Sequence, residues 1–434
     1  MKAVFSAPRG IGGHFIPPAD KSLTHRALML ASLAAGSSWI ANPLDTGDCL
    51  STRACLAALG VAIAESGRGS AKGLRVEGVG LRGFREPAGV LDAGNSGTTL
   101  RLLCGLLAGQ ALYAVAGGDS SLLSRPMLRV VGPLRAMGAR IEGRGGGRYA
   151  PLSFLPGGEL RPLSCELEVP SAQVKSALLL AALRASAPVR LAGRLDSRDH
   201  TERLFAYLGL PLRREGGALV MEPVKSIPPF EAEIPGDVSS AAFFVTAALI
   251  CGRELWVRRC GLNPTRLGFI RFAGRMGARI EILEESSLAG EPAGSLHVLP
   301  ADLNGAAVEE GEVPFLIDEI PLVAVLACFA RGVTEVRGAG ELRHKESDRI
   351  QAIAALIRAL GGEITLFEDG FRLEGPQPLR GGAVDPAGDH RIAMAAAVLG
   401  AGLPGEVEVA GFDAARVSFP DFIAVFRQLG GEVR

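Results

Sequence analysis

The sequence predicts an α/β protein of two similar domains, each built from three strand-helix-strand-helix-strand repeats with buried helices and outer sheets. Three observations lead to this prediction. A glycine that ends an amphipathic helix recurs six times, a more apolar helix lies between successive copies, and short strand-like runs precede both helices. Such alternation of strands and helices is typical of α/β folds. A chain of 434 residues is long enough for two domains with substantial cores.

The recurring glycine follows an apolar residue and precedes a strand-like run, as a helix C-cap does. It stands at Gly60, Gly138, Gly209, Gly277, Gly361 and Gly430. The amphipathic helices predicted before these glycines are Cys49–Leu59, Pro126–Met137, Thr201–Leu208, Thr265–Met276, Asp348–Leu360 and Asp421–Leu429. The apolar helices begin near Lys21, Ser96, Ser171, Ser239, Asp318 and His390. Strands precede both helix types, for example Cys165–Val169 and Val189–Leu191 in the third repeat.

The two chain ends are predicted to meet in the last repeat. Only Glu432–Arg434 follow the sixth glycine pair, whereas Lys2–Ile16 holds two strand-like runs with no helix before them. Prolines at Pro17 and Pro235 restrict their neighbours to extended geometry and mark two crossovers. We therefore expect one domain of residues 18–235 and another of residues 1–17 plus 236–434. A single closed ring of six repeats is the alternative.

Composition excludes several classes of protein. A formal net charge of zero gives no overall field for nucleic acid or acidic membranes. The longest apolar stretches are too short to span a bilayer, and the first residues lack the apolar core of a signal peptide. The seven cysteines are scattered without CxxC spacing, and the histidines stand apart from them. These features predict a reduced, cytoplasmic protein without a metal site.

Leu91–Gly109 is the stretch most suggestive of ligand binding. Small, turn-forming residues at Asp92–Thr99 lead into the apolar helix Leu100–Ala108. Exposed N–H groups and the helix dipole at such a start favour an anion, and Arg101 adds a positive charge. The alternative is a capped core helix with no ligand.

Basic residues gather at the starts of otherwise apolar helices in both halves. Because helix N-termini lie on one side of parallel βα units, they are expected to face one cleft for a small polyanion. The residues are Lys21, Arg26, Arg101, Arg125, Arg198, Lys345, Arg349 and Arg391. Among them, Asp318 and Glu346 are candidates for proton transfer. The alternatives are a helix N-cap for Asp318 and an ordinary ion pair for Glu346, and His390 is more simply part of a capped helix start.

Ten motifs together resemble the 5-enolpyruvylshikimate-3-phosphate (EPSP) synthase family in order and spacing over nearly the whole chain. They are DKSLTHRAL, LDAGNSGTTLRL, SRPM, SAQVKSALLL, SRDHTERL, PGDVSSAAFF, LIDEIP, HKESDRI, DHRIAMA and SFPDF. The resemblance implies the enolpyruvyl transferase-like inverse α/β barrel and transfer of the enolpyruvyl group of phosphoenolpyruvate to the 5-hydroxyl of shikimate 3-phosphate. It also implies release of phosphate, a place in aromatic amino acid biosynthesis, no cofactor and a monomer whose domains close on substrate.

The resemblance also assigns roles by motif. Shikimate 3-phosphate binding is implied for Lys21, Ser22, Arg26, Ser171, Ala172, Gln173, Arg198, Asp318 and Lys345. Phosphoenolpyruvate binding is implied for Lys21, Gly97, Thr98, Arg125, Gln173, Arg349 and Arg391. Asp318 would accept the proton of the 5-hydroxyl, assisted by Lys345 or Lys21, and Glu346 would move the proton at the methylene carbon.

The chain departs from part of that family at a few positions. Ala172 stands where those members have a serine, and Glu341 stands where they have an asparagine. Thr201 lies near the position at which those members have a tyrosine that stacks on the shikimate ring. A lysine before the SFPDF motif is absent, with Val417 there and Arg416 beside it. Together these changes resemble the family's second subgroup.

Two other functions remain as alternatives. A UDP-N-acetylglucosamine enolpyruvyl transferase has the same repeats, but it uses a cysteine in a loop that here, in Gly117–Ser124, has none. Its Lys-Asn pair is Lys21-Ser22 in this chain. A non-catalytic anion-binding repeat protein would not need both Asp318 and Glu346 among so many cations.

Overall fold

The computed structural model describes residues 1–68 and 71–434. The chain forms two compact units. Unit 1 comprises Met1–Pro18, Pro235–Ser286 and Pro292–Arg434, and unit 2 comprises Ala19–Ile234 with Ser287–Glu291. Each unit has its own apolar core. Within the described residues, every helix is too short or too polar to cross a membrane.

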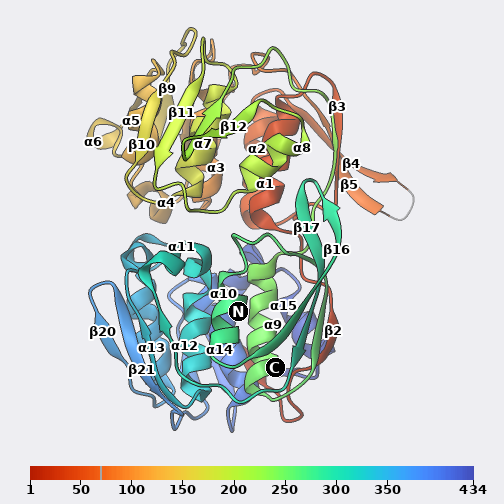
Figure 1. Cartoon of the computed structure of the whole chain (residues 1–434), viewed down its shortest axis with the longest axis vertical. Coiled ribbons are helices and arrows are strands. Elements are labelled where there is room, and N and C mark those ends of the chain that lie inside the picture. The colour runs from red at the N-terminus through yellow and green to blue at the C-terminus, as the bar shows by residue number, and fades with distance from the viewer. Residues whose placement is uncertain (69–70) are drawn as a thin grey trace. The chain divides into compact units, whose positions relative to one another are not determined.

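Each unit contains buried helices at its centre and amphipathic helices beside them (Figure 1). The buried helices are α1 (Lys21–Ser32), α3 (Gly97–Leu107) and α7 (Ala172–Ala182) in unit 2, and α9 (Val238–Ile250), α12 (Ile320–Phe329) and α14 (His390–Gly402) in unit 1. The amphipathic helices are α2 (Gly47–Ala58), α5 (Leu128–Ala136), α8 (His200–Tyr207), α10 (Gly268–Arg275), α13 (Arg349–Ala359) and α15 (Phe422–Gln428). The predicted pairing of two helix types per repeat is confirmed.

Short helical turns complete the helical part. They are α4 (Ser120–Ser124), α6 (Arg144–Gly147), α11 (Val313–Leu316), η1 (Glu310–Glu312), η2 (Ile317–Glu319), η3 (Gly340–His344) and η4 (Phe412–Val417). All six recurring glycines have φ between 67° and 107°, which confirms them as left-handed helix caps. The helix predicted to start at Thr265 begins at Gly268, because the Asn263 side chain accepts from the Thr265 N–H and forms a turn there.

The strands of the described chain form four-stranded sheets, one per repeat. In unit 2 their orders are β14-β3-β5-β4, β6-β7-β9-β8 and β10-β11-β13-β12. The bounds are β3 (Ser37–Ala41), β4 (Ala62–Arg68), β5 (Ala71–Glu77), β6 (Leu91–Asp92), β7 (Ala114–Gly117), β8 (Ile141–Gly143), β9 (Tyr149–Phe154), β10 (Ser164–Leu167), β11 (Val189–Gly193), β12 (Leu212–Glu215), β13 (Ala218–Met221) and β14 (Glu231–Glu233).

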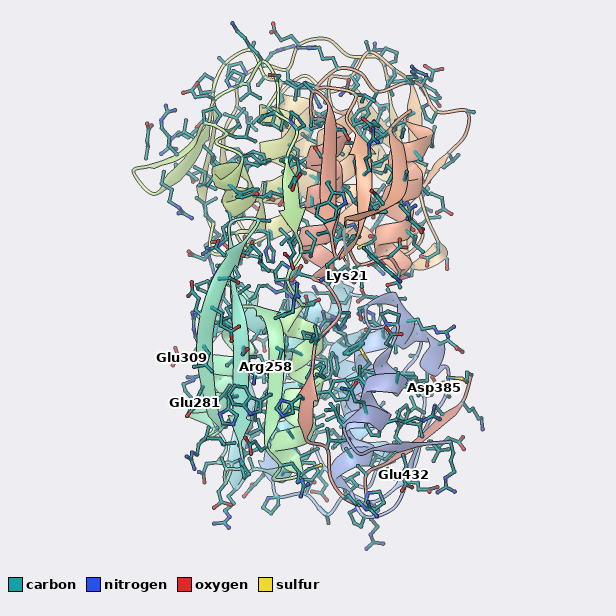
Figure 2. All side chains as sticks on the ribbon, turned by 90° about the vertical axis from the view of Figure 1, so that its right-hand side faces the viewer. Lys21, Arg258, Glu281, Glu309, Asp385 and Glu432 are labelled. Carbon is teal, nitrogen blue, oxygen red and sulfur yellow. The ribbon has the colours of Figure 1, made fainter. Side chains whose placement is uncertain are left out.

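Unit 1 has the same arrangement, with orders β16-β17-β15-β2, β18-β19-β21-β20 and β22-β23-β1-β24. Its strands are β1 (Ala3–Ser6), β2 (Gly13–Phe15), β15 (Leu255–Gly261), β16 (Arg279–Leu288), β17 (Glu291–Leu299), β18 (Ala307–Val308), β19 (Gly332–Val336), β20 (Thr365–Phe367), β21 (Gly370–Gly375), β22 (Gly382–Val384), β23 (Val407–Val409) and β24 (Glu432–Val433). Arg258 of β15 and Glu281 of β16 are labelled in Figure 2. Every sheet contains one parallel pair, as the βα units require.

In each unit, one strand of one sheet comes from a part of the chain that is far from the other three strands of that sheet. β2 precedes α1 in sequence but pairs in parallel with β15 of unit 1. β14 precedes α9 but pairs in parallel with β3 of unit 2. Each unit therefore completes its three sheets with a strand that directly precedes the first helix of the other unit.

The two chain ends share one sheet. β1 lies between β23 and β24, with Phe5 opposite Val407 on one side and Val433 on the other. β1 therefore completes the sixth repeat, which confirms the prediction for the first strand-like run. The prediction is wrong for the second run, because β2 pairs with β15 in the sheet of the fourth repeat.

Candidate active site

In unit 2, the start of α3 is a capped helix N-terminus with the features that favour an anion. The Ser96 hydroxyl caps the helix by accepting from the Thr99 N–H at 3.1 Å. The first N–H groups of the helix, at Gly97 and Thr98, have no carbonyl within the helix to accept them. Together with the helix dipole, they favour a negatively charged group at this end.

Two arginines flank this turn. The Arg101 guanidinium donates to Gln173 Oε1 at 2.7 Å, and Gln173 in turn donates to the Thr98 hydroxyl at 3.0 Å. A Cβ atom at Gly97 would lie 2.8 Å from Arg101 Nη1 and 3.4 Å from Arg125 Nη1. Glycine at this position therefore lets both guanidinium groups approach the helix start.

Arg125 is held in place from its other side. It donates to the Asn95 side chain at 2.6 Å and to the Ser121 hydroxyl at 3.0 Å, and it is nearly buried. A buried guanidinium with fixed donors suits a carboxylate or a phosphate, whose paired oxygens match its fork.

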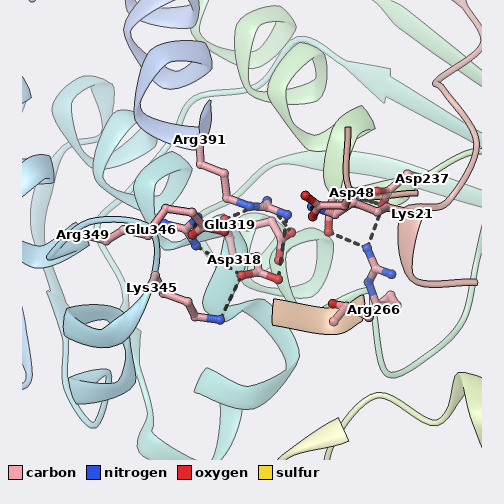
Figure 3. A network of polar contacts seen from close by, with 12 residues as sticks. Lys21, Asp48, Asp237, Arg266, Asp318, Glu319, Lys345, Glu346, Arg349 and Arg391 are labelled. Atoms are coloured by element: carbon pink, nitrogen blue, oxygen red, sulfur yellow. Dashed lines mark hydrogen bonds and ion pairs between the residues drawn. The ribbon is translucent and has the colours of Figure 1, made fainter. Parts of the chain in front are cut away.

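The start of α1 carries a second set of predicted residues. Lys21 Nζ lies 3.0 Å from Asp48 Oδ2, a pair drawn in Figure 3. Arg26 is buried, and it donates to the Ser22 carbonyl and to the Ser176 hydroxyl. These contacts fix Arg26 beneath the helix start.

The remaining predicted residues of unit 2 lie at the starts of α7 and α8. Ser171 is the N-cap of α7, and its hydroxyl accepts from the Val174 N–H. Ala172 is the first residue of that helix, and Arg198 is half-buried in the turn before α8.

In unit 1, one carboxylate lies among three cations (Figure 3). Asp318 Oδ1 lies 3.3 Å from Lys345 Nζ and 3.3 Å from Arg349 Nη1. Arg391 Nη2 lies 3.8 Å from Asp318 Oδ2, and Arg391 Nη1 donates to the backbone carbonyl of Asp318 at 3.0 Å. Asp318, Lys345, Arg349 and Arg391, predicted from three separate motifs, are therefore brought together.

Arg349 is the buried centre of this cluster, with its side chain only 1 % exposed. It lies 2.5 Å from Glu346 Oε2 and 2.8 Å from Asp389 Oδ2. Burial alone would lower the pKa of the guanidinium, but the carboxylates of Glu346, Asp389 and Asp318 outweigh burial and raise it. Burial likewise favours a higher pKa for Asp389, but Arg349 lowers it below its ordinary value. Both groups are therefore held in their charged forms.

The helix-cap interpretation of Asp318 is wrong. Asp318 lies in the turn η2, and α12 begins at Ile320 with Pro321 in its first turn. Proline has no N–H to donate and suits a helix start, so the helix begins later than the sequence suggested. Glu346 does form an ion pair with Arg349, and Asp389 caps α14 by accepting from the Arg391 N–H.

The departures from the family pattern have visible local consequences. Thr201 is buried, and its hydroxyl accepts from Arg26 Nε at 2.8 Å, so it joins α8 to α1. Ser418 is buried after η4, whereas Arg416 is exposed on that turn.

Three buried cysteines of the chain are unsuited to nucleophilic chemistry. All seven thiols are free, and five of them are buried. Burial raises the pKa of Cys55, Cys104 and Cys328 to about 12. These thiols therefore stay protonated, and a thiolate is the reactive form.

Sequence reasoning missed several residues of these clusters. Asp48 and Asn95 orient Lys21 and Arg125, and Asp389 holds Arg349. Asn95 lies inside a quoted motif, but neither it nor Asp48 carries a pattern that reveals which distant cation it contacts.

Comparison with known proteins gives one consistent result. Residues 6–426 match the family model described as EPSP synthase (3-phosphoshikimate 1-carboxyvinyltransferase). The chain is 49% identical over 425 residues to a 3-phosphoshikimate 1-carboxyvinyltransferase of Thermus thermophilus, covering 97% of each chain. It is 42% identical to that of Shouchella clausii over 430 residues, covering 99% of each.

Solved structures agree with the sequence comparisons. An EPSP synthase from Acinetobacter baumannii matches with a TM-score of 0.87 at 35% identity, covering all of both chains. The enolpyruvyl transferase NikO from Streptomyces tendae matches with a TM-score of 0.79 at 16% identity, covering 100% of this chain and 98% of that one, and so shares the fold. The predicted enolpyruvyl transferase-like fold is confirmed, and the chain belongs to the EPSP synthase family.

Proposed function

We infer that the protein is an enzyme that transfers the enolpyruvyl group of phosphoenolpyruvate to the 5-hydroxyl of shikimate 3-phosphate and releases phosphate. The family match over residues 6–426 is the observation that carries this function. The reaction serves the shikimate pathway of aromatic amino acid biosynthesis. The protonated, buried thiols argue against the cysteine-dependent UDP-N-acetylglucosamine reaction.

For the substrates, we propose that each unit contributes part of the binding machinery. The phosphate of phosphoenolpyruvate suits the start of α3, with the N–H groups of Gly97 and Thr98 and the fork of Arg125. Shikimate 3-phosphate suits the helix starts that carry Ser22, Ser171 and Arg198. Lys21, Arg26, Gln173, Arg349 and Arg391 complete the proposed set.

For the chemistry, we propose that Asp318 takes the proton of the 5-hydroxyl as its oxygen attacks C2 of phosphoenolpyruvate. Glu346 in its protonated form delivers that proton to the methylene carbon C3 and becomes the carboxylate that pairs with Arg349. The C2–O bond to phosphate then breaks while Glu346 takes a proton back from C3, which restores the enol ether. Lys345 lies 3.3 Å from Asp318 and stabilises its ionised form, which is the form that accepts a proton. Arg349 holds the Glu346 side chain in place through their ion pair.

The test is phosphate release from phosphoenolpyruvate by the full chain, with and without shikimate 3-phosphate. Release that requires shikimate 3-phosphate, with EPSP formed in equal amount, supports the proposal. Release that requires UDP-N-acetylglucosamine instead, or binding without any turnover, contradicts it. A monomeric state, a cytoplasmic location, closure of the domains on substrate and the lack of a cofactor stay predictions.

A further inference from the structure

The turn between β16 and β17 is tied to unit 2 although the two strands belong to a sheet of unit 1. β16 ends at Leu288 and β17 begins at Glu291, so Ala289 and Gly290 form a two-residue hairpin loop (Figure 1). Both have positive φ, 50° and 79°. A non-glycine residue in this region is strained, and such strain persists only where the surroundings hold it.

What holds the loop is helix α8. Ala289 is buried within the apolar core of unit 2. A Cβ atom at Gly290 would lie 2.8 Å from the Arg203 carbonyl and 3.0 Å from Tyr207 Cβ. The hairpin loop therefore lies directly against the backbone of α8, and only glycine allows this approach.

Glu291 places a buried carboxylate beside the first turn of that helix. Its side chain is 2 % exposed, and Oε1 lies 2.7 Å from Nδ1 of His200, whose side chain is 3 % exposed. Oε2 lies 3.9 Å from Arg203 Nε. Burying a carboxylate is unfavourable unless partners compensate for it, so a hairpin loop with no further role would not need one.

The helix start that Glu291 contacts directly follows the turn that carries Arg198. Other groups already fix the backbone and the far side of this turn: Lys175 donates to the carbonyls of Leu195 and Ser197, and Arg26 donates to Thr201. The 2.7 Å contact between Nδ1 of His200 and Oε1 of Glu291 restrains the orientation of the imidazole ring. Glu291 thereby restrains the first residue of α8, two residues after Arg198.

We propose that the β16–β17 hairpin loop is a positioning element for shikimate 3-phosphate, with Glu291 acting through His200 to hold the Arg198 turn in its binding geometry. The inference rests on the proposed function, because it takes Arg198 as a ligand of shikimate 3-phosphate. It assigns part of the affinity for that substrate to a hairpin whose strands lie in the sheet of unit 1.

The experiment measures shikimate 3-phosphate affinity by calorimetry and steady-state constants for both substrates, using the full chain. Glu291→Ala should raise the dissociation constant of shikimate 3-phosphate about tenfold, with the KM for phosphoenolpyruvate and kcat within about twofold, since it removes a charge-assisted hydrogen bond. Glu291→Gln keeps an acceptor for His200 and should weaken binding by only about threefold. Glu284→Ala, an exposed carboxylate on the same hairpin, is the matched control and should behave as wild type.

Each outcome decides the proposal. Wild-type affinity in Glu291→Ala, or an equal loss for both substrates and kcat, would overturn it and leave a purely structural role. If Glu291→Ala does not fold, wild-type affinity in Glu291→Gln overturns it. Failure of the wild-type protein to bind shikimate 3-phosphate would instead overturn the proposed function, which keeps the two failures distinct.

Discussion

At the scale of single residues, charge pairing determines which groups are available for chemistry. Asp318 lies at the surface of its cluster, beside Lys345, whereas Asp389 is completely buried against Arg349. The Asp318 carboxylate is partly exposed, as the proposed proton acceptor has to be, whereas the Asp389 carboxylate orients a guanidinium. Substitutions at the two positions should therefore have different effects.

Asp318→Asn should lower turnover by roughly 10²–10⁴-fold with a modest change in substrate binding, the range expected for loss of a general base. The measurement is phosphate release under saturating substrates. Asp302→Asn, an exposed aspartate of the same unit, should leave turnover unchanged. Turnover within about threefold of wild type in Asp318→Asn would contradict the assigned role.

Asp389→Asn should destabilise unit 1 by about 1.5–3 kcal/mol near neutral pH, because it removes the charged acceptor of Arg349 Nε and leaves only Glu346 and Asp318 to compensate the buried guanidinium. Asparagine still caps α14, so the cap is preserved.

This difference in stability should depend on pH in a defined direction. Arg349 lowers the pKa of Asp389 in the folded state, so its contribution is complete above the unfolded value of 3.8 and is lost as pH falls through the still lower folded value. The thermal unfolding temperatures of the wild-type protein and of Asp389→Asn should differ most at about pH 5–7 and begin to converge below about pH 4. A constant difference across this range would show that the charge of Asp389 is not the cause.

At the scale of elements, the start of α3 depends on Gly97, whose lack of a Cβ atom leaves room for two guanidinium groups. Gly97→Ala should raise the KM for phosphoenolpyruvate about tenfold. The added Cβ would lie only 2.8 Å from Arg101 Nη1 and 3.4 Å from Arg125 Nη1, so the Arg101 guanidinium would have to move and Arg125 would be crowded. Affinity for shikimate 3-phosphate should stay within about twofold.

The fold should tolerate that change, because alanine is favoured over glycine in helices by about 1 kcal/mol. Gly132→Ala in α5 is the matched control, as open space surrounds its added methyl group. Steady-state kinetics of the two variants should separate a steric effect at α3 from a general helix effect. An unchanged KM in Gly97→Ala would remove α3 from the phosphoenolpyruvate site.

At the scale of the whole molecule, each unit has its own apolar core, so we expect the two units to differ in how a core substitution destabilises them. Phe5 belongs to the first strand of the chain, yet its ring is fully buried in unit 1, 4.6 Å from the Phe412 ring and 5.2 Å from that of Phe426. A change at the N-terminus should therefore destabilise a unit formed mostly by the C-terminal half.

Phe5→Ala should destabilise unit 1 by about 3–5 kcal/mol through the cavity it leaves. Hydrogen exchange followed by peptide should show faster opening of unit 1 and unchanged protection in Ala19–Ile234. Phe154→Ala, in a sheet of unit 2, should give the reverse pattern. Equal loss of protection in both units would show that they unfold as one.

The sequence by itself determined the repeats, the two helix types and the meeting of the chain ends. These features follow from local periodicity and from glycine caps such as Gly60 and Gly277, which neighbouring residues specify directly. The motifs also named the cations and the two carboxylates that the structure places in clusters within each unit.

Only the tertiary structure decided which distant groups meet. Asp48 contacts Lys21, Asp389 contacts Arg349, and Glu291 contacts His200, and no sequence spacing encodes these pairs. The same is true of β2 and β14, which pair away from the helices they precede. The physical reason is that periodicity reports the faces of an element, whereas partners across elements depend on how several faces pack at once.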